Sequence, residues 1–137
     1  MDDNCLFCKI VANETPSYTV YEDDVTKAFL DIFPSTEGHV VVILKKHGWA
    51  IGEYTSEELG FLMGTVQKVV AALTKALKTE VFTIGMNHKE ENGVHHLHIH
   101  VLPRFPEDGG SVIQSVVERE GKDSLLDIAE KIKKEIR

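Results

Sequence analysis

The most regular hydrophobic pattern in the chain lies in its middle third. Apolar residues recur every three or four positions from Leu59 to Leu77, which is the spacing of one face of an α-helix. Thr55 and Glu58 precede this run in the order of a capping box, in which each side chain bonds to the backbone N–H of the other residue. This pattern predicts a long amphipathic helix that begins just after Thr55.

Shorter apolar runs lie on both sides of this helix and predict strands. They are Tyr18 to Tyr21, Val25 to Asp31, His39 to Leu44, Glu80 to Met86 and His95 to Leu102. An acidic, turn-prone triplet separates the first two runs and indicates a hairpin. The third is nearly all aliphatic, as is typical of a strand buried on both faces. We expect the last strand to stop at Pro103, because proline cannot donate a ladder hydrogen bond.

Helical spacing also marks both ends of the chain. Leu6 to Ala12 predicts a short helical turn and Ser124 to Ile136 an amphipathic helix, whereas Val112 to Val117 has no pattern that assigns it. Because the strands come in hairpins, we predict an α+β fold in which an antiparallel sheet carries one long helix. No repeat or linker divides the sequence, so residues 1–137 are expected to form a single domain.

Composition limits the class of protein further. The chain has 137 residues, of which 42% are hydrophobic and 27% charged, which is ordinary for a globular protein. The aliphatic run Val40 to Leu44 is too short to cross a bilayer and the opening Met1 to Asn4 is acidic, so we expect no membrane segment or signal peptide and a cytoplasmic protein. The formal net charge of -7 disfavours a nucleic-acid partner.

The candidate chemistry lies in an alternating stretch near the end of the last predicted strand. His96, His98 and His100 alternate with aliphatic residues, so on a strand the three imidazoles face one way and the aliphatic side chains face the core. Three protonated imidazoles would repel one another, and at least part of the row should therefore be neutral near pH 7. A neutral imidazole can attack phosphorus while its neighbours donate to the phosphoryl oxygens.

A simpler interpretation is a solvated polar face of an edge strand. The strict alternation with aliphatic residues favours function over that interpretation. His95 falls on the opposite face at the start of the strand, and His88 lies in a polar loop, so both are interpreted as ordinary surface or loop histidines.

With these histidines in place, the sequence resembles the histidine-triad family, whose signature alternates three histidines with hydrophobic residues. The resemblance also covers the segments Cys5 to Ile10, Val20 to Asp24, Ala28 to Ile32, Gly38 to Ile43 and Leu102 to Arg104. It implies a five-stranded antiparallel half-barrel in each subunit of a homodimer, with one sheet continuous across the dimer. The chain after Arg104 has no matching motif.

The resemblance also implies roles for individual residues. His98 would attack the α-phosphate and form a nucleotidyl-histidine intermediate, His100 would contact the phosphate, and His39 would support the triad from the neighbouring strand. Asp31 would hold the ribose hydroxyls, since a carboxylate can accept from two hydroxyls at once, and Asn87 would belong to the site. The apolar walls around the base would be Leu6, Phe7, Ile10, Phe29 and Ile32, which from their pattern alone are core residues.

The loop ahead of the triad departs from the family pattern. The stretch from Asn87 to His96 is two residues shorter than in typical members, Gly93 stands where many relatives carry a hydroxyl, and His95 replaces an apolar or aromatic residue. A missing donor near the leaving group indicates weak turnover or a different preferred leaving group. Leu44 in place of the usual proline is expected to change only the end of its strand.

Cys5 and Cys8 have the spacing that zinc prefers, but a structural zinc site needs two more ligands. The resemblance implies that His47 and His96 complete a tetrahedron, and zinc would then orient His96 without being required for catalysis. The alternative is a pair of buried, reduced cysteines beside a surface histidine.

Together these features favour a hydrolase that binds a purine nucleoside monophosphate and cleaves phosphoramidates or related nucleotide conjugates through His98. A dinucleoside polyphosphate hydrolase would use the same residues with another leaving group. A nucleotide-binding regulatory or adaptor protein with little turnover is the alternative from a different class, and the altered loop keeps it open. A module that binds metal through all three histidines is disfavoured, because a row along one strand does not converge on one ion.

Overall fold

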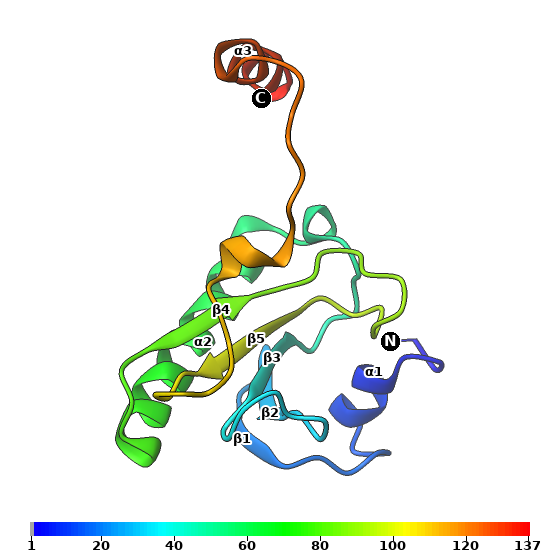
Figure 1. Ribbon diagram of the computed structural model, residues 1–137. Helices are drawn as coiled ribbons and strands as arrows, with labels where there is room; N and C mark the ends of the chain where they lie inside the picture. The colour runs from blue at the N-terminus through cyan, green and yellow to red at the C-terminus, as the bar shows by residue number, and fades with distance from the viewer. Residues whose placement is uncertain (1) are drawn as a thin grey trace.

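The computed structural model describes residues 2–137, and Met1, which opens the acidic first segment, lies outside them. Five strands form one antiparallel open sheet in the order β1-β2-β3-β5-β4 (Figure 1). The elements are α1 (Leu6–Val11), β1 (Thr19–Glu22), β2 (Thr26–Leu30), β3 (Val40–Leu44), η1 (Ile51–Glu53), α2 (Ser56–Leu77), β4 (Phe82–Gly85), β5 (His98–Pro103), η2 (Ile113–Val116) and α3 (Leu125–Glu135). The predicted α+β class, with five antiparallel strands, one long helix and a C-terminal helix, is confirmed.

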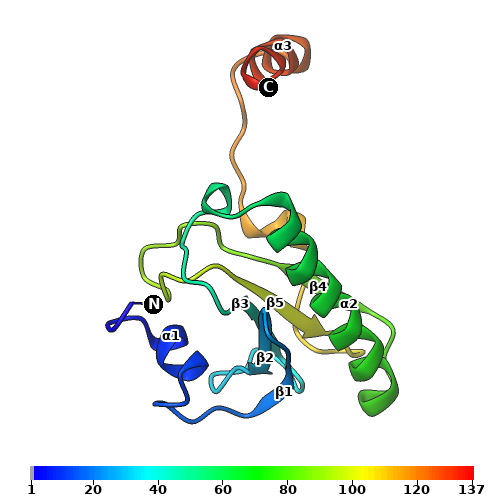
Figure 2. The same ribbon diagram turned by 180° about the vertical axis from the view of Figure 1, so that it is seen from behind.

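The central strand β3 is buried along its whole length because helices cover both faces of the sheet. Val40, Val42 and Leu44 pack with α2 in one hydrophobic cluster, whereas Val41 and Ile43 pack with α1 in another. Figure 2 shows α2 lying across one face of the sheet. The two-sided burial explains why this strand is an unbroken aliphatic run.

The start of α2 follows the predicted capping box. Thr55 Oγ1 accepts a hydrogen bond from the Glu58 N–H at 3.1 Å, and the Glu58 carboxylate accepts one from the Thr55 N–H at 2.8 Å. At the other end, Lys78 adopts a left-handed conformation with φ of 55° and stops the helix.

Strand β5 differs from its predicted bounds at both ends. It begins at His98 instead of His95, because the backbone before it turns: the His96 N–H donates to Val94 O at 2.8 Å and the Leu97 N–H to Gly48 O at 2.7 Å. It also runs through Pro103, so the prediction that this proline lies beyond the strand is wrong. The next bond goes to the residue just before the neighbouring edge strand β4, from the Arg104 N–H to Val81 O at 2.8 Å.

The C-terminal part leaves the sheet and ends in a helix with no packing partner among the described residues. Val112 to Val117, which the sequence left unassigned, contains η2. Beyond it an extended segment leads to α3, which stands apart from the body of the molecule in Figures 1 and 2. Leu125 and Ile132 of α3 are 90% and 55% exposed. Within residues 2–137, none of the helices combines the length and the apolar character needed to cross a membrane.

Candidate functional site

His98 and His100 lie on the face of the sheet that α1 covers. They pair with Ile43 and Val41 of β3, which belong to the cluster on that face, while Ile99 and Val101 point into the α2 core. The rings of His98 and His100 are 4.9 Å apart between centroids. The alternation predicted from the sequence is therefore confirmed for these two histidines.

The local backbone fixes the tautomer of His98. Its Nδ1 lies 2.6 Å from the backbone oxygen of His96, and a carbonyl can only accept, so Nδ1 carries the hydrogen and donates it. In the neutral ring Nε2 then holds a lone pair. The Phe7 ring stands edge-on to the imidazole, 5.1 Å away between centroids, and limits how the ring can turn. The arrangement presents one imidazole nitrogen as a nucleophile.

A second hydrogen-bond chain fixes the tautomer of His100. The Ser35 N–H donates to His39 Nδ1 at 3.1 Å, so the hydrogen of the neutral His39 ring is on Nε2. That atom lies 2.8 Å from His100 Nδ1 and donates to it. His100 therefore carries its own hydrogen on Nε2, where it can donate to an anionic group beside His98.

Burial keeps the histidines around His98 neutral. Desolvation is the largest cause that lowers the pKa of His100 to about 4, and the neighbouring His98 and His39 act in the same direction. Burial also lowers the pKa of His39, although the negative charge of Asp31 opposes it. The row can therefore surround His98 with neutral hydrogen-bonding groups at pH 7, in line with the sequence-based expectation.

Asp31 follows β2 and lies at the edge of this row. Its Oδ2 is 3.5 Å from His39 Nε2, and its Oδ1 accepts a hydrogen bond from the Phe33 N–H at 2.8 Å. The side chain is 23% exposed, so the carboxylate still reaches solvent. It is thus available to accept hydrogen bonds from a ligand beside the histidines.

The five residues expected to form the walls of a base pocket divide into two groups. Phe7 and Phe29 are buried, with their rings 5.3 Å apart, and Ile10 is buried with them. Leu6 and Ile32 are 42% and 65% exposed. The structure therefore places the first three in the core beneath the histidine face and leaves the other two on the surface.

Asn87 lies between two cavities that flank the histidines. One cavity is shared with Trp49, Glu90 and His98. The other has a volume of about 330 Å³, and its lining includes His39 and His100 as well as Ile113 and Val116 of η2. The segment after Arg104, for which the sequence offered no motif, thus forms part of the wall next to His100.

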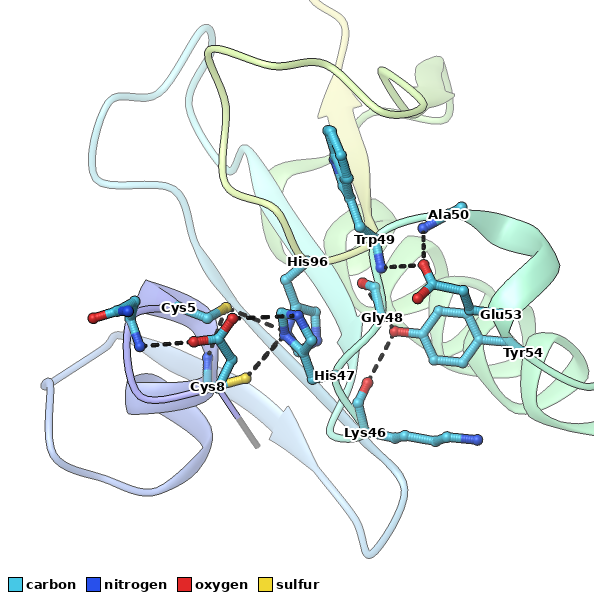
Figure 3. A network of polar contacts seen from close by, with 12 residues as sticks. Cys5, Cys8, Lys46, His47, Gly48, Trp49, Ala50, Glu53, Tyr54 and His96 are labelled. Atoms are coloured by element: carbon cyan, nitrogen blue, oxygen red, sulfur yellow. Dashed lines mark hydrogen bonds and ion pairs between the residues drawn. The ribbon is translucent and has the colours of Figure 1, made fainter.

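The four predicted metal ligands come together at the end of the site nearest α1 (Figure 3). Cys8 lies in α1 and Cys5 is the residue just before that helix. His47 follows β3, and His96 precedes β5. Their ligand atoms all lie within 4.8 Å of one another. His96 is fully buried and faces α1, so it belongs to this cluster. It does not lie in β5, which begins at His98.

The geometry of this cluster fits a tetrahedral zinc ion. Cys8 Sγ lies 3.2 Å from His47 Nδ1 and 3.6 Å from His96 Nδ1, and Cys5 Sγ is 3.6 Å from His96 Nδ1. Tetrahedral bonds of about 2.3 Å to sulfur and about 2.0 Å to nitrogen would place the ligand atoms about 3.5 Å apart. His96 Nε2 donates to Leu44 O at 2.7 Å, which turns Nδ1 toward the sulfurs.

The sequence did not predict the contacts that two histidines make in the loop before His96. His95, expected to be an ordinary surface histidine, stacks on Trp49 with 4.1 Å between ring centroids. His88 Nε2 accepts a hydrogen bond from the Ile51 N–H at 2.9 Å and so ties this loop to η1. The shortened loop indicates in the sequence that this region is unusual. It does not predict these contacts, because the partners Trp49 and Ile51 come from a distant segment of the chain.

Fold and site together define a class of protein: an antiparallel α+β domain that presents a row of imidazoles, with a carboxylate at one end and, at the other, four cysteine and histidine side chains that could hold a metal ion. A family model described as the HIT domain matches residues 12–107. The chain therefore belongs to the HIT family.

Individual relatives agree with this assignment. The chain is 39% identical to Protein hit of Bacillus subtilis over 114 residues, covering 79% of this chain and 76% of that protein. It is 33% identical to adenosine 5'-monophosphoramidase HNT1 of Saccharomyces cerevisiae, covering 82% of this chain and 70% of the relative.

Solved structures share the fold over most of the chain. A crystal structure of a HIT family member from Bacillus subtilis has a TM-score of 0.85 at 32% identity and covers 98% of this chain and 99% of that chain. A Zn-bound histidine triad family protein from Mycobacterium smegmatis has a TM-score of 0.71 at 31% identity, covering 77% of this chain and 78% of that chain.

Proposed function

We propose that this protein is a hydrolase of nucleotide conjugates that binds a purine nucleoside monophosphate and cleaves phosphoramidates at its phosphorus. The observation that carries the proposal is the 2.6 Å contact from His98 Nδ1 to His96 O, which leaves His98 Nε2 as a nucleophile. The similarity to an adenosine 5'-monophosphoramidase supports the substrate class. Residues 1–137 act as a single domain in this proposal.

In the first step the lone pair of His98 Nε2 forms a bond to phosphorus, and the bond from phosphorus to the leaving nitrogen breaks. That nitrogen keeps the electron pair and takes a proton from solvent. His100 Nε2–H donates to a phosphoryl oxygen as charge moves onto it, and His39 holds His100 in the required tautomer through their 2.8 Å contact. The product is a nucleotidyl-histidine.

In the second step water attacks the same phosphorus and loses a proton to solvent. The bond to His98 Nε2 breaks, and its electron pair returns to the ring. The His98 Nδ1–H bond to His96 O remains in place throughout, and it stabilises the ring while Nε2 carries the phosphoryl group. The enzyme returns to its starting state without any metal at phosphorus.

We place the nucleoside along the α1 face of the sheet. Asp31 accepts hydrogen bonds from the ribose hydroxyls, and Asn87 contacts the phosphate end. The exposed Leu6 and Ile32 contact the base, and the buried Phe7, Ile10 and Phe29 form the apolar core beneath it. Exposed apolar side chains next to a buried aromatic pair suit a flat ligand.

We propose a structural zinc ion in the cluster of Cys5, Cys8, His47 and His96. The ligand separations and the bond from His96 to Leu44 O support it, and so does the similarity to a Zn-bound relative. When bound, zinc supplies rigidity at the start of β5. His96 is then a positioning residue, because its carbonyl orients His98.

We also propose that the protein is a cytoplasmic homodimer. β4 is an unpaired edge of the sheet, and α3 exposes an apolar stripe that has no partner among residues 2–137. An isolated helix of 11 residues is marginal in water, so packing on a second subunit would account for its amphipathic pattern.

The function is tested with adenosine 5'-phosphoramidate and a His98→Ala variant. We expect the variant to lose turnover by about 10⁴-fold or more while it still binds AMP in calorimetry. Equal turnover by both proteins would remove His98 from the mechanism. AMP binding without turnover of any conjugate by the wild-type protein would instead favour a nucleotide-binding regulatory protein.

A further inference from the structure

A small cavity next to His98 contains a carboxylate that the proposed mechanism does not use. Two loops line it, with Trp49 from the loop before η1 and Asn87, Glu90 and Val94 from the loop before His96. Glu90 is the one acidic group among the residues that line this cavity. We call this cavity the Glu90 cavity.

The loop backbone holds Glu90 in place and leaves it room. Glu90 Oε1 accepts a hydrogen bond from the Asn92 N–H at 3.1 Å. A Cβ atom at residue 93 would lie too close to Glu90 Oε2, the end of a flexible side chain, so a side chain there would make the carboxylate move. The absence of a side chain at residue 93 therefore leaves the Glu90 carboxylate in its place on the wall of the cavity that it shares with His98.

The order of contacts along the site assigns a role to this cavity. Starting from Asp31, the contacts run to His39 at 3.5 Å, to His100 at 2.8 Å, and to His98 with 4.9 Å between ring centroids. The Glu90 cavity lies beyond His98 in this series. The cavity itself, at about 10 Å³, is too small to enclose a leaving group. With ribose at Asp31 and phosphorus at His98, as in the proposed function on which this inference rests, the leaving group departs past the mouth of this cavity, where the charge of Glu90 acts on it.

We infer that Glu90 determines which leaving group the enzyme prefers. An amine that leaves takes a proton from solvent and becomes a cation at pH 7, which a carboxylate attracts. Sulfate or phosphate leaves with the electron pair as an anion, which the same carboxylate repels. Glu90 therefore favours phosphorus–nitrogen bonds over mixed anhydrides.

Other charged or titratable groups contact Trp49, and one is a second carboxylate: Glu53 accepts a hydrogen bond from the Trp49 N–H at 2.8 Å. Lys89 Nζ lies 5.0 Å from the centroid of the Trp49 ring, and His95 stacks on that ring at 4.1 Å. None of these side chains is among those that line the cavity with His98. Among the residues that line the cavity with His98, Glu90 is therefore the one that brings a carboxylate.

The test compares adenosine 5'-phosphoramidate with adenosine 5'-phosphosulfate for the wild-type protein and Glu90→Gln. We expect the ratio of kcat/KM for phosphosulfate over phosphoramidate to rise about fivefold in the variant, a size suited to a solvent-exposed charge. Glu91→Gln is the matched control, because it removes the same charge from a neighbouring exposed residue that does not line the cavity. Its ratio should remain that of the wild type.

A second variant separates charge from position. Gly93→Ala retains the carboxylate but displaces it, so it should raise the ratio in the wild-type background and not in Glu90→Gln. Equal ratios in Glu90→Gln and Glu91→Gln would overturn the role of Glu90 and leave the proposed function intact. Cleavage of neither substrate by the wild-type protein would overturn both.

Discussion

His39 Nε2 lies 2.8 Å from His100 Nδ1, joining the residue before β3 to the middle of β5. The Ser35 N–H occupies the other nitrogen of His39, so the direction of this contact is fixed: His39 donates and His100 accepts. One backbone N–H thus decides, through two rings, which nitrogen of His100 presents a hydrogen to a ligand.

Replacing His39 with alanine should therefore reduce turnover without removing the nucleophile. His100 would lose the donor that fixes its tautomer, and we expect kcat to fall roughly tenfold to hundredfold with a smaller change in KM. Steady-state kinetics with adenosine 5'-phosphoramidate measures both constants. His39→Gln retains an amide donor and should recover part of kcat, whereas equal loss in both variants would argue against the donor role.

We expect the protein to lose stability as the pH is lowered from about 6.5 to about 4. In this range His100 is neutral in the folded protein but protonated in the unfolded chain. Burial lowers its pKa to about 4, compared with 6.5 for an ordinary histidine. Between these values the unfolded chain binds a proton that the native protein does not, so the free energy of unfolding decreases as pH falls, by up to about 1.4 kcal/mol per pH unit.

Urea unfolding of the wild-type protein and His100→Asn, both in the presence of a chelator, measures this contribution. The variant should have the shallower dependence between pH 6.5 and pH 4.5. Parallel curves for the two proteins would mean that His100 does not carry the effect.

Removal of zinc should destabilise the N-terminal part of the site. We expect metal analysis to find one zinc per chain, and a chelator to lower the Tm by several degrees, which is roughly the effect of a ligand present at 100 times its Kd. Cys8→Ser should lose both the metal and the shift. His88→Asn, a histidine outside the cluster, should retain them, and a full zinc content in Cys8→Ser would contradict the assigned ligands.

The exposed stripe of α3 should control the oligomeric state. Light scattering on the wild-type protein should give twice the mass of one chain. Leu125→Glu combined with Ile132→Glu places charge on residues that are 90% and 55% exposed in the single chain and should shift the mass toward the monomer. Glu130→Gln, on the polar part of the same helix, should not. A monomeric wild-type protein would refute the dimer.

Much of the fold follows from local patterns. The capping box of Thr55 and Glu58, the helical spacing behind it and the aliphatic run of β3 predict their elements because each pattern records one local environment. The bounds of β5, in contrast, do not follow from the local pattern. Its start depends on the bond from the Leu97 N–H to Gly48 O, a partner almost fifty residues away.

The sequence likewise predicts some features of the candidate site and not others. The alternation predicted that His98 and His100 share a face, and the cysteine spacing predicted a metal site. The tautomers did not follow, because Ser35 and the His96 carbonyl act through hydrogen bonds that only the folded backbone creates. The sequence also could not tell which of the five proposed base contacts are buried and which are exposed. Apolar character alone does not distinguish the buried Phe29 from the exposed Ile32.

By itself the sequence determined the types of element and the chemical groups available, because side-chain periodicity and ligand spacing are properties of neighbouring residues. Only the tertiary structure decided the order of groups from Asp31 to Glu90 and the face on which they meet. Those relationships join separate segments of the chain, and contacts between distant segments depend on how the sheet pairs and packs.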